Sequence, residues 1–186
     1  RYGHTMAFSP QQILVLLFGG ASACVGSVTF FNDLWGWDGA KGQDLSQSHD
    51  TINGRHGHAM SYDRNLNRIV LFGGGAGTGL FKDTWAWNGN WQMLQLSPGT
   101  SPPNVLLDVA GAYVHDKGFV IVGNKDTYLF DGSQWLMNPS GPSPPITSYG
   151  AMVEIPNVRY GNSVDHSALL YGGWTGESDT SYSDES

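Results

Sequence analysis

Charged residues are scarce in this sequence, at 13% of its 186 residues. Soluble domains usually carry about 25%. The exposed faces of an α-helical bundle require many Glu and Lys side chains, so the low charge argues against that class. Gly, Pro, Asn or a β-branched run also interrupts every window in which a long amphipathic helix could form. We therefore expect an all-β protein.

Basic residues are few as well: 9 Lys and Arg stand against 16 Asp and Glu, for a formal net charge of −7. Binding to nucleic acid or to an anionic membrane depends on clustered Lys and Arg, whereas the basic residues here are scattered. No apolar run approaches the roughly 20 residues of a membrane-spanning helix. We therefore expect neither a nucleic-acid partner nor a membrane span.

Cys24 is the single cysteine, which excludes an intrachain disulfide and a zinc site built on cysteines. The sequence has no initiator Met and no signal peptide and opens on a repeated motif, so we expect a processed or incomplete polypeptide. The many Ser, Thr, Asn and Trp residues, with little charge and almost no cysteine, favour an extracellular or cell-surface location.

What the sequence does contain is an internal repeat. In its clearest copy the apolar run Ile69–Phe72 ends in Gly73-Gly74, and Asp83–Gly89 and Trp91 follow. The apolar run predicts a strand that is buried on both faces. The alternation of large and small residues in the next element predicts a second strand, and its final Asn-Gly pair predicts a tight hairpin turn.

The same elements recur upstream of this copy. The upstream elements are Ile13–Phe18, Gly19-Gly20 and Asp33–Gly39. An Arg-x-Gly-His-x-Met element opens both copies, so that Gly3 and Gly57 lie 54 positions apart. The polar segment 40–53 lacks the expected Trp, and the fourth strand of the first unit is therefore expected to be degenerate.

A third copy is degenerate, and a fourth is partial. In the third, Phe119–Val122 is the apolar run, Asp126–Gly132 matches the Trp-containing element, and Trp135 matches Trp91. We align Gly111 with Gly57, again 54 positions apart. The fourth copy consists of Tyr149–Met152 and Ala168–Gly173, with Pro156–Asp165 between them as a predicted insertion.

This pattern resembles the kelch repeat, in which a hydrophobic strand is followed by Gly-Gly, an aromatic residue and a Trp. Its Arg-x-Gly-His-x-Met and Asp-x-Trp-x-Trp-x-Gly elements look like those of bacterial kelch proteins and of the central domain of galactose oxidases. The resemblance implies a β-propeller of four-stranded antiparallel blades. A WD40 propeller is the nearest competitor, but the spacing of 54 is too long for it. The residues that carry the motif are Gly19, Gly20, Trp35, Gly73, Gly74, Trp85, Trp91, Tyr128, Trp135, Gly172 and Gly173.

The resemblance divides the chain into units. Kelch-like blades are expected at residues 1–53, 54–103 and 104–145, a partial blade at 146–174, and a polar acidic tail with the composition of a disordered segment at 175–186. Because propellers have about four to eight blades, we expect a fragment of a larger ring. The alternatives are a small four-bladed ring, and an open arc that other propeller segments or self-association would close.

Two sets of residues recur at equivalent positions and could carry chemistry. His4 and His58 could converge on a metal ion, but recurrence in two units favours hydrogen bonds within each blade. Asp33, Asp83 and Asp126 precede the aromatic strand in three units. Their regular recurrence favours capping of a turn through backbone N–H groups over calcium binding.

Galactose oxidases bind copper through Tyr and His ligands and carry a Tyr crosslinked to Cys. Cys24 and the 8 Tyr residues make a fragment of such an enzyme one alternative, although no ligand can be matched residue by residue. A fold resemblance does not transfer an activity. We therefore assign no catalytic residue, no cofactor and no metal ligand, and we expect binding in place of catalysis.

The variable loops are the remaining candidates for function, since binding residues concentrate on loops of a rigid scaffold. These loops are Ala21–Phe31, Gly75–Phe81, Asn104–Asp108 and Pro156–Asp165. At their ends, Phe30, Phe31, Leu80 and Phe81 are candidate binding residues, with packing beneath the loop as the alternative. The expected function is a binding or scaffold module for a protein or glycan partner. A structural protein that assembles through exposed blade edges is a further alternative.

Overall fold

A computed structural model describes residues 1–24, 27–48, 51–77, 79–104, 107–123, 126–137, 150–160 and 163–172. Every regular element within these ranges is a β-strand, and the expectation of an all-β protein is confirmed. None of these residues forms a helix that is long and apolar enough to cross a membrane.

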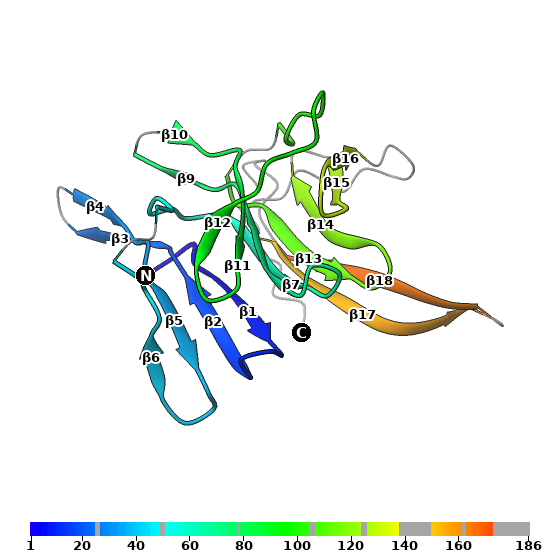
Figure 1. Cartoon of the computed structure of the whole chain (residues 1–186), viewed down its shortest axis with the longest axis horizontal. Helices are drawn as coiled ribbons and strands as arrows, with labels where there is room; N and C mark the ends of the chain where they lie inside the picture. Colours follow the sequence, from blue (N-terminus) through cyan, green and yellow to red (C-terminus); the bar gives the residue numbers. More distant parts are fainter. Residues whose placement is uncertain are drawn as a thin grey trace, which may run out of the picture.

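Three four-stranded antiparallel sheets follow one another along the chain (Figure 1). Sheet 1 contains β1 (Thr5–Ser9), β2 (Leu14–Phe18), β5 (Leu34–Trp37) and β6 (Gly42–Asp44). Sheet 2 contains β7 (Ala59–Asp63), β8 (Arg68–Phe72), β11 (Thr84–Trp87) and β12 (Trp91–Met93). Sheet 3 contains β13 (Ala110–Val114), β14 (Gly118–Gly123), β15 (Asp126–Phe130) and β16 (Trp135–Met137).

Three hairpins complete the described fold. A long hairpin of β17 (Ala151–Tyr160) and β18 (Ser163–Tyr171) follows sheet 3. A hairpin of β3 (Ala21–Cys24) and β4 (Ser27–Phe30) lies between β2 and β5. A shorter one, formed by β9 (Gly75–Ala76) and β10 (Gly79–Leu80), occupies the same place between β8 and β11.

Three segments predicted as loops instead contain paired strands, and one of them, Gly75–Phe81, contains the β9–β10 hairpin. The segment Ala21–Phe31 contains the β3–β4 ladder, and the predicted insertion Pro156–Asp165 is part of the β17–β18 hairpin. The register of that hairpin shifts between Ile155 and Val158. Pro156 cannot donate a backbone hydrogen bond, so a strand accommodates it at such an irregularity.

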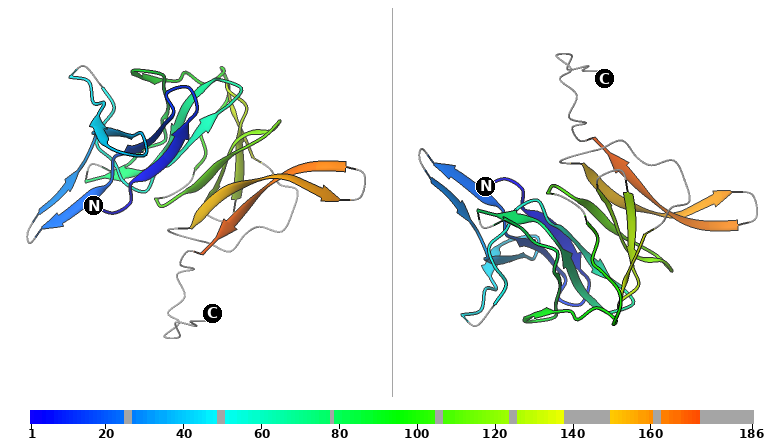
Figure 2. Two further views of the ribbon diagram at one scale, coloured as in Figure 1. Left: turned by 90° about the horizontal axis from the view of Figure 1, so that it is seen from below. Right: turned by 90° about the horizontal axis from the view of Figure 1, so that it is seen from above.

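The first strands of successive sheets lie side by side, β1 next to β7, β7 next to β13, and β13 next to β17. The sheets therefore fan out from a common line, which the two views of Figure 2 show from below and from above. The described residues form an open arc and do not close a ring.

Each sheet of this arc has two faces, which we name by their place along the chain. The leading face of sheet 1 includes Met6, Leu17 and Trp35, which are aligned across β1, β2 and β5. The equivalent leading face of sheet 2 includes Met60, Leu71 and Trp85. The opposite, trailing face of each sheet turns toward the next sheet along the chain.

The trailing face of one sheet packs against the leading face of the next. Between sheets 1 and 2, Phe18 of the trailing face contacts Trp91, with ring centroids 4.9 Å apart. The same contact recurs between sheets 2 and 3, where Phe72 and Trp135 are 4.7 Å apart. Because the apolar strand β8 contributes to both cores, it is buried on both faces as predicted.

Backbone hydrogen bonds also join the sheets just before their first strands. The N–H of Gly57 donates to the carbonyl of Gly3 at 2.8 Å, and the N–H of Asp108 donates to the carbonyl of Gly57 at 2.9 Å. All three residues have positive φ, of 63°, 65° and 63°. The chain thus crosses from sheet to sheet through one repeated backbone conformation.

This conformation corrects the alignment of the third unit. Gly111 was aligned with Gly57, but Gly111 lies inside β13 opposite Ile121. Asp108 occupies the equivalent position, three residues earlier. Asp is one of the few residues other than Gly that adopts the left-handed conformation readily. The third unit therefore keeps the backbone geometry although it lacks the glycine.

We predict that Trp135→Ala lowers the free energy of unfolding by about 3–5 kcal/mol, the usual cost of removing a buried aromatic side chain. Trp135 is buried, and its indole N–H donates to Thr84 Oγ1 of sheet 2 at 2.9 Å. The neighbouring Leu136 is exposed, and Leu136→Ala should change stability by no more than about 0.5 kcal/mol. Urea denaturation of both variants measures the difference, and equal losses would contradict this packing.

Candidate functional site

The two short hairpins, β3–β4 and β9–β10, project from the same edge of the arc (Figure 1). Each follows the second strand of its sheet, so it emerges beside the point where the first strand begins. Val28 and Leu80 are exposed on these hairpins. We call this side of the molecule the hairpin edge.

Two of the four candidate binding residues pack beneath arginines. The guanidinium of Arg1 lies 4.1 Å from the centre of the Phe31 ring, and that of Arg55 lies 4.3 Å from the Phe81 ring. Both phenylalanines are half-buried. Their contacts agree with packing beneath the loop, the alternative considered for these residues.

The other two candidates lie at the surface of the hairpin edge. Leu80 is exposed, and the half-buried Phe30 contacts the imidazole of His56 with ring centroids 5.3 Å apart. Tyr2 packs edge-on against the same imidazole at 5.9 Å and is itself partly exposed. Tyr2 and Phe30 of the first unit and His56 of the second therefore form a small aromatic cluster.

Arg55 has the most completely satisfied charged side chain in this region. Its guanidinium is fully buried and forms two hydrogen bonds with the carboxylate of Asp83, at 2.6 and 2.9 Å. It also donates to the carbonyls of Gly73 and Asn53. Burial raises the pKa of Asp83, but the hydrogen bonds and charge of Arg55 and the Trp85 indole outweigh it, so the pKa is lowered.

These contacts correct the expected role of the recurrent aspartates. Asp33 and Asp83 each accept hydrogen bonds from an arginine and from the indole of the Trp two residues later. The Arg1–Asp33 pair is only partly buried. In the third unit, Asp126 instead accepts from the Tyr128 hydroxyl at 3.4 Å. The sequence alone did not indicate a role for Arg1 or Arg55, although both open the repeated Arg-x-Gly-His element.

A polar cavity of about 230 Å³ lies at the start of the first strands. Its lining includes His4, Thr5, His58 and Asp108, which come from three successive units. The two equivalent histidines thus reach the same cavity. Among the described residues, no hydrogen-bond partner lies within reach of Nδ1 of His4 or Nδ1 of His58.

His58 is held neutral in this cavity. It is buried, packs edge-on against Phe18, and shares a hydrogen bond of 2.6 Å between its Nε2 and Thr5 Oγ1. Burial, with smaller contributions from the charges of Arg55, His56 and His4, lowers the pKa of His58 to about 3. A neutral imidazole can hydrogen-bond to an uncharged polar ligand as donor or acceptor.

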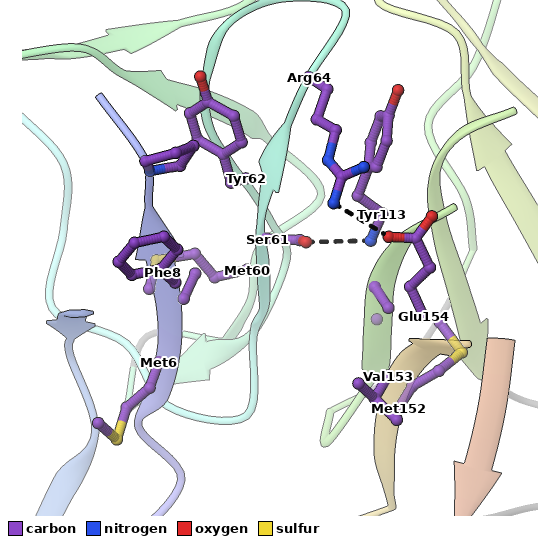
Figure 3. A pocket seen from close by; sticks show the side chains of 14 residues that line it. Met6, Phe8, Met60, Ser61, Tyr62, Arg64, Tyr113, Met152, Val153 and Glu154 are labelled. Carbon is purple, nitrogen blue, oxygen red and sulfur yellow. Dashed lines mark hydrogen bonds and ion pairs between the residues drawn. The ribbon is translucent and has the colours of Figure 1, made fainter. Parts of the chain in front are cut away.

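A larger groove of about 500 Å³ follows the first strands on the inner side of the arc. Figure 3 shows Met6, Phe8 and Met60 on one side, and Arg64 and Glu154, which point toward each other, on the other. The Arg64 guanidinium lies 3.4 Å from the Glu154 carboxylate. This ion pair links β17 to the turn that follows β7. The groove is mainly apolar and carries one ion pair.

Among the described residues, no group of three or more His, Cys, Asp or Glu side chains is placed to hold a metal ion. Cys24 lies in β3, at the end of the first hairpin ladder. The histidine pair in the polar cavity therefore lacks a third ligand among these residues.

No family model matches this chain, and a search of curated proteins finds no match either.

We predict that Arg55→Met destabilises the protein by about 3–5 kcal/mol, because it leaves the partly buried Asp83 carboxylate without its partner. Arg1→Met is the matched control. Its ion pair is more exposed, so the expected loss is below about 1 kcal/mol. Thermal or urea unfolding distinguishes the two, and similar losses would show that burial does not set the strength of this contact.

We predict that acid destabilises the protein through His58. The folded-state pKa is depressed from 6.5 to about 3, so the unfolded chain binds the additional proton between these values. The stabilisation is complete above pH 6.5 and is lost as pH falls toward 3, by up to about 1.4 kcal/mol per pH unit. Urea denaturation at successive pH values should show this slope in the wild type and a shallower one in His58→Gln.

Proposed function

We propose that the chain consists of kelch-like propeller blades and acts as a non-catalytic binding module. The three sheets, with their repeated face-to-face packing, support blades of this kind. The double glycines support the kelch type, because both residues of each pair have positive φ: 66° and 95° at Gly19 and Gly20, and 72° and 85° at Gly73 and Gly74. A Cβ on Gly74 would lie 2.7 Å from the His56 carbonyl oxygen, so the chain needs glycine there.

The hairpin edge is the surface we propose for the partner. The observation that carries this proposal is the convergence of two exposed hairpins, an aromatic cluster and a polar cavity at one edge. Tyr2 and Phe30 offer ring surfaces, and the polar cavity beside them is lined by His4, Thr5, His58 and Asp108. Aromatic rings and neutral hydrogen-bonding groups suit a glycan better than a charged ligand, and a protein segment is the second partner class. The composition favours an extracellular or cell-surface setting for such binding.

We predict that the double variant Val28→Asp/Leu80→Asp reduces glycan binding at least about tenfold, since a carboxylate on each hairpin disrupts apolar contact there. Screening the purified chain against immobilised oligosaccharides and polysaccharides identifies a ligand, and titration calorimetry then compares the variants. Leu136→Asp replaces a similarly exposed leucine on sheet 3 and should bind as the wild type does. Equal binding by the double variant and the wild type would place the site elsewhere.

A further inference from the structure

The leading face of sheet 1 is apolar, and no other sheet of the described residues packs on it. Its six side chains lie in two rows across the sheet: Met6, Leu17 and Trp35 form one, and Phe8, Val15 and Trp37 form the other. In sheet 2 the equivalent residues lie beneath sheet 1. Three pairs of equivalent positions show the difference in exposure between sheet 1 and sheet 2. The exposed fraction is 55% for Met6 and 4% for Met60, and 41% for Trp35 and 6% for Trp85. It is 50% for Trp37 and 4% for Trp87.

At the other end of the arc, the trailing face of the β17–β18 hairpin is also apolar, and no sheet formed by the described residues packs on it. Val153 and Leu169 face each other across the ladder, as do Ala151 and Tyr171. Val153, Leu169 and Tyr171 are 59%, 49% and 78% exposed. Within the arc, faces of this type are covered by the leading face of the next sheet.

We propose that the leading face of sheet 1 binds the trailing face of the β17–β18 hairpin of a second copy of this chain. The contact continues an interface that the chain already uses between sheets 1 and 2 and again between sheets 2 and 3. Both complementary surfaces are present on one molecule, at the two ends of the arc (Figure 2). Met6 and Phe8 of one surface and Val153 of the other border the same groove, and the remaining residues of each surface lie outside it. A single head-to-tail contact therefore covers the exposed tryptophans of one copy and the exposed hairpin of the other.

This contact is heterologous, since it joins two different surfaces. Heterologous contacts close into a ring when the rotation between copies permits it and otherwise continue into an open chain. The contact differs from pairing at blade edges, because it uses side chains on sheet faces and leaves the outer strands free. It is independent of ligand binding at the hairpin edge, which lies elsewhere on the molecule.

The test is sedimentation equilibrium of the purified chain across the micromolar range, where a monomer has a mass of 20.1 kDa. The wild type should increase in mass with concentration. Trp37→Glu places a carboxylate on the leading face, and Leu169→Glu places one on the trailing face. Each variant alone should remain monomeric, because every contact needs both faces intact.

Mixing the two variants gives the decisive result. The Leu169→Glu chain retains its leading face and the Trp37→Glu chain retains its trailing face, so the mixture should form a dimer with one copy of each and nothing larger. Val28→Glu, on the hairpin edge, is the matched control and should associate as the wild type does. Circular dichroism verifies that each variant is folded, and Met6→Glu and Val153→Glu replace any variant that is not.

Three results would overturn the proposal. A wild type that stays at 20.1 kDa would show that the two faces do not join copies of this chain. Association that both face variants retain would locate the contact elsewhere, for example at strand edges. A mixture that stays monomeric, while the wild type associates, would show that the two faces do not bind each other.

Discussion

The structure depends on one repeated contact, the packing of a trailing face on the leading face of the next sheet. A single sheet of this chain has apolar residues on both sides and cannot shield them by itself. Phe18 against Trp91, and Phe72 against Trp135, show the same pair of elements meeting at two successive boundaries. Stability is therefore shared between neighbours. Sheets 2 and 3 have a neighbour on each side, whereas sheet 1 packs against sheet 2 alone among the described residues.

The hairpin edge is built on this framework by a second repeated device. Arg1 and Arg55 each join an aspartate to a phenylalanine at the base of a hairpin, the first near the surface and the second in the interior. The buried contact of Arg55 with Asp83 and Phe81 fixes the position at which the β9–β10 hairpin leaves sheet 2. The aromatic cluster and the polar cavity thus stand on rigid supports, as surfaces that present loops to a partner require.

Much of this fold follows from the sequence, because strand period and turn residues are local signals. The apolar run before Gly73-Gly74 and the alternation before Gly89 correctly predicted β8 and β11. The misalignment of Gly111 had a physical origin: the feature that recurs from unit to unit is a positive φ, which Asp108 adopts without being glycine. The polar cavity could not be predicted, since it forms where Thr5, His58 and Asp108 of three different units meet. Whether a partner binds the hairpin edge is likewise a matter of surface shape, which spacing in a sequence does not record.

The backbone hydrogen bonds from Gly57 to Gly3 and from Asp108 to Gly57 have a consequence for how such a chain can grow. The groups that join the units at this point are amides and carbonyls, which every copy possesses. The hydrogen bond itself therefore places no demand on side-chain chemistry. The size of the side chain is restricted, because the residue must adopt a left-handed backbone and a Cβ on Gly57 would lie 2.8 Å from the backbone nitrogen of Asp108. A further unit inserted at this point would keep the connection only with Gly, or with a residue such as Asp that adopts the same conformation, at the equivalent position.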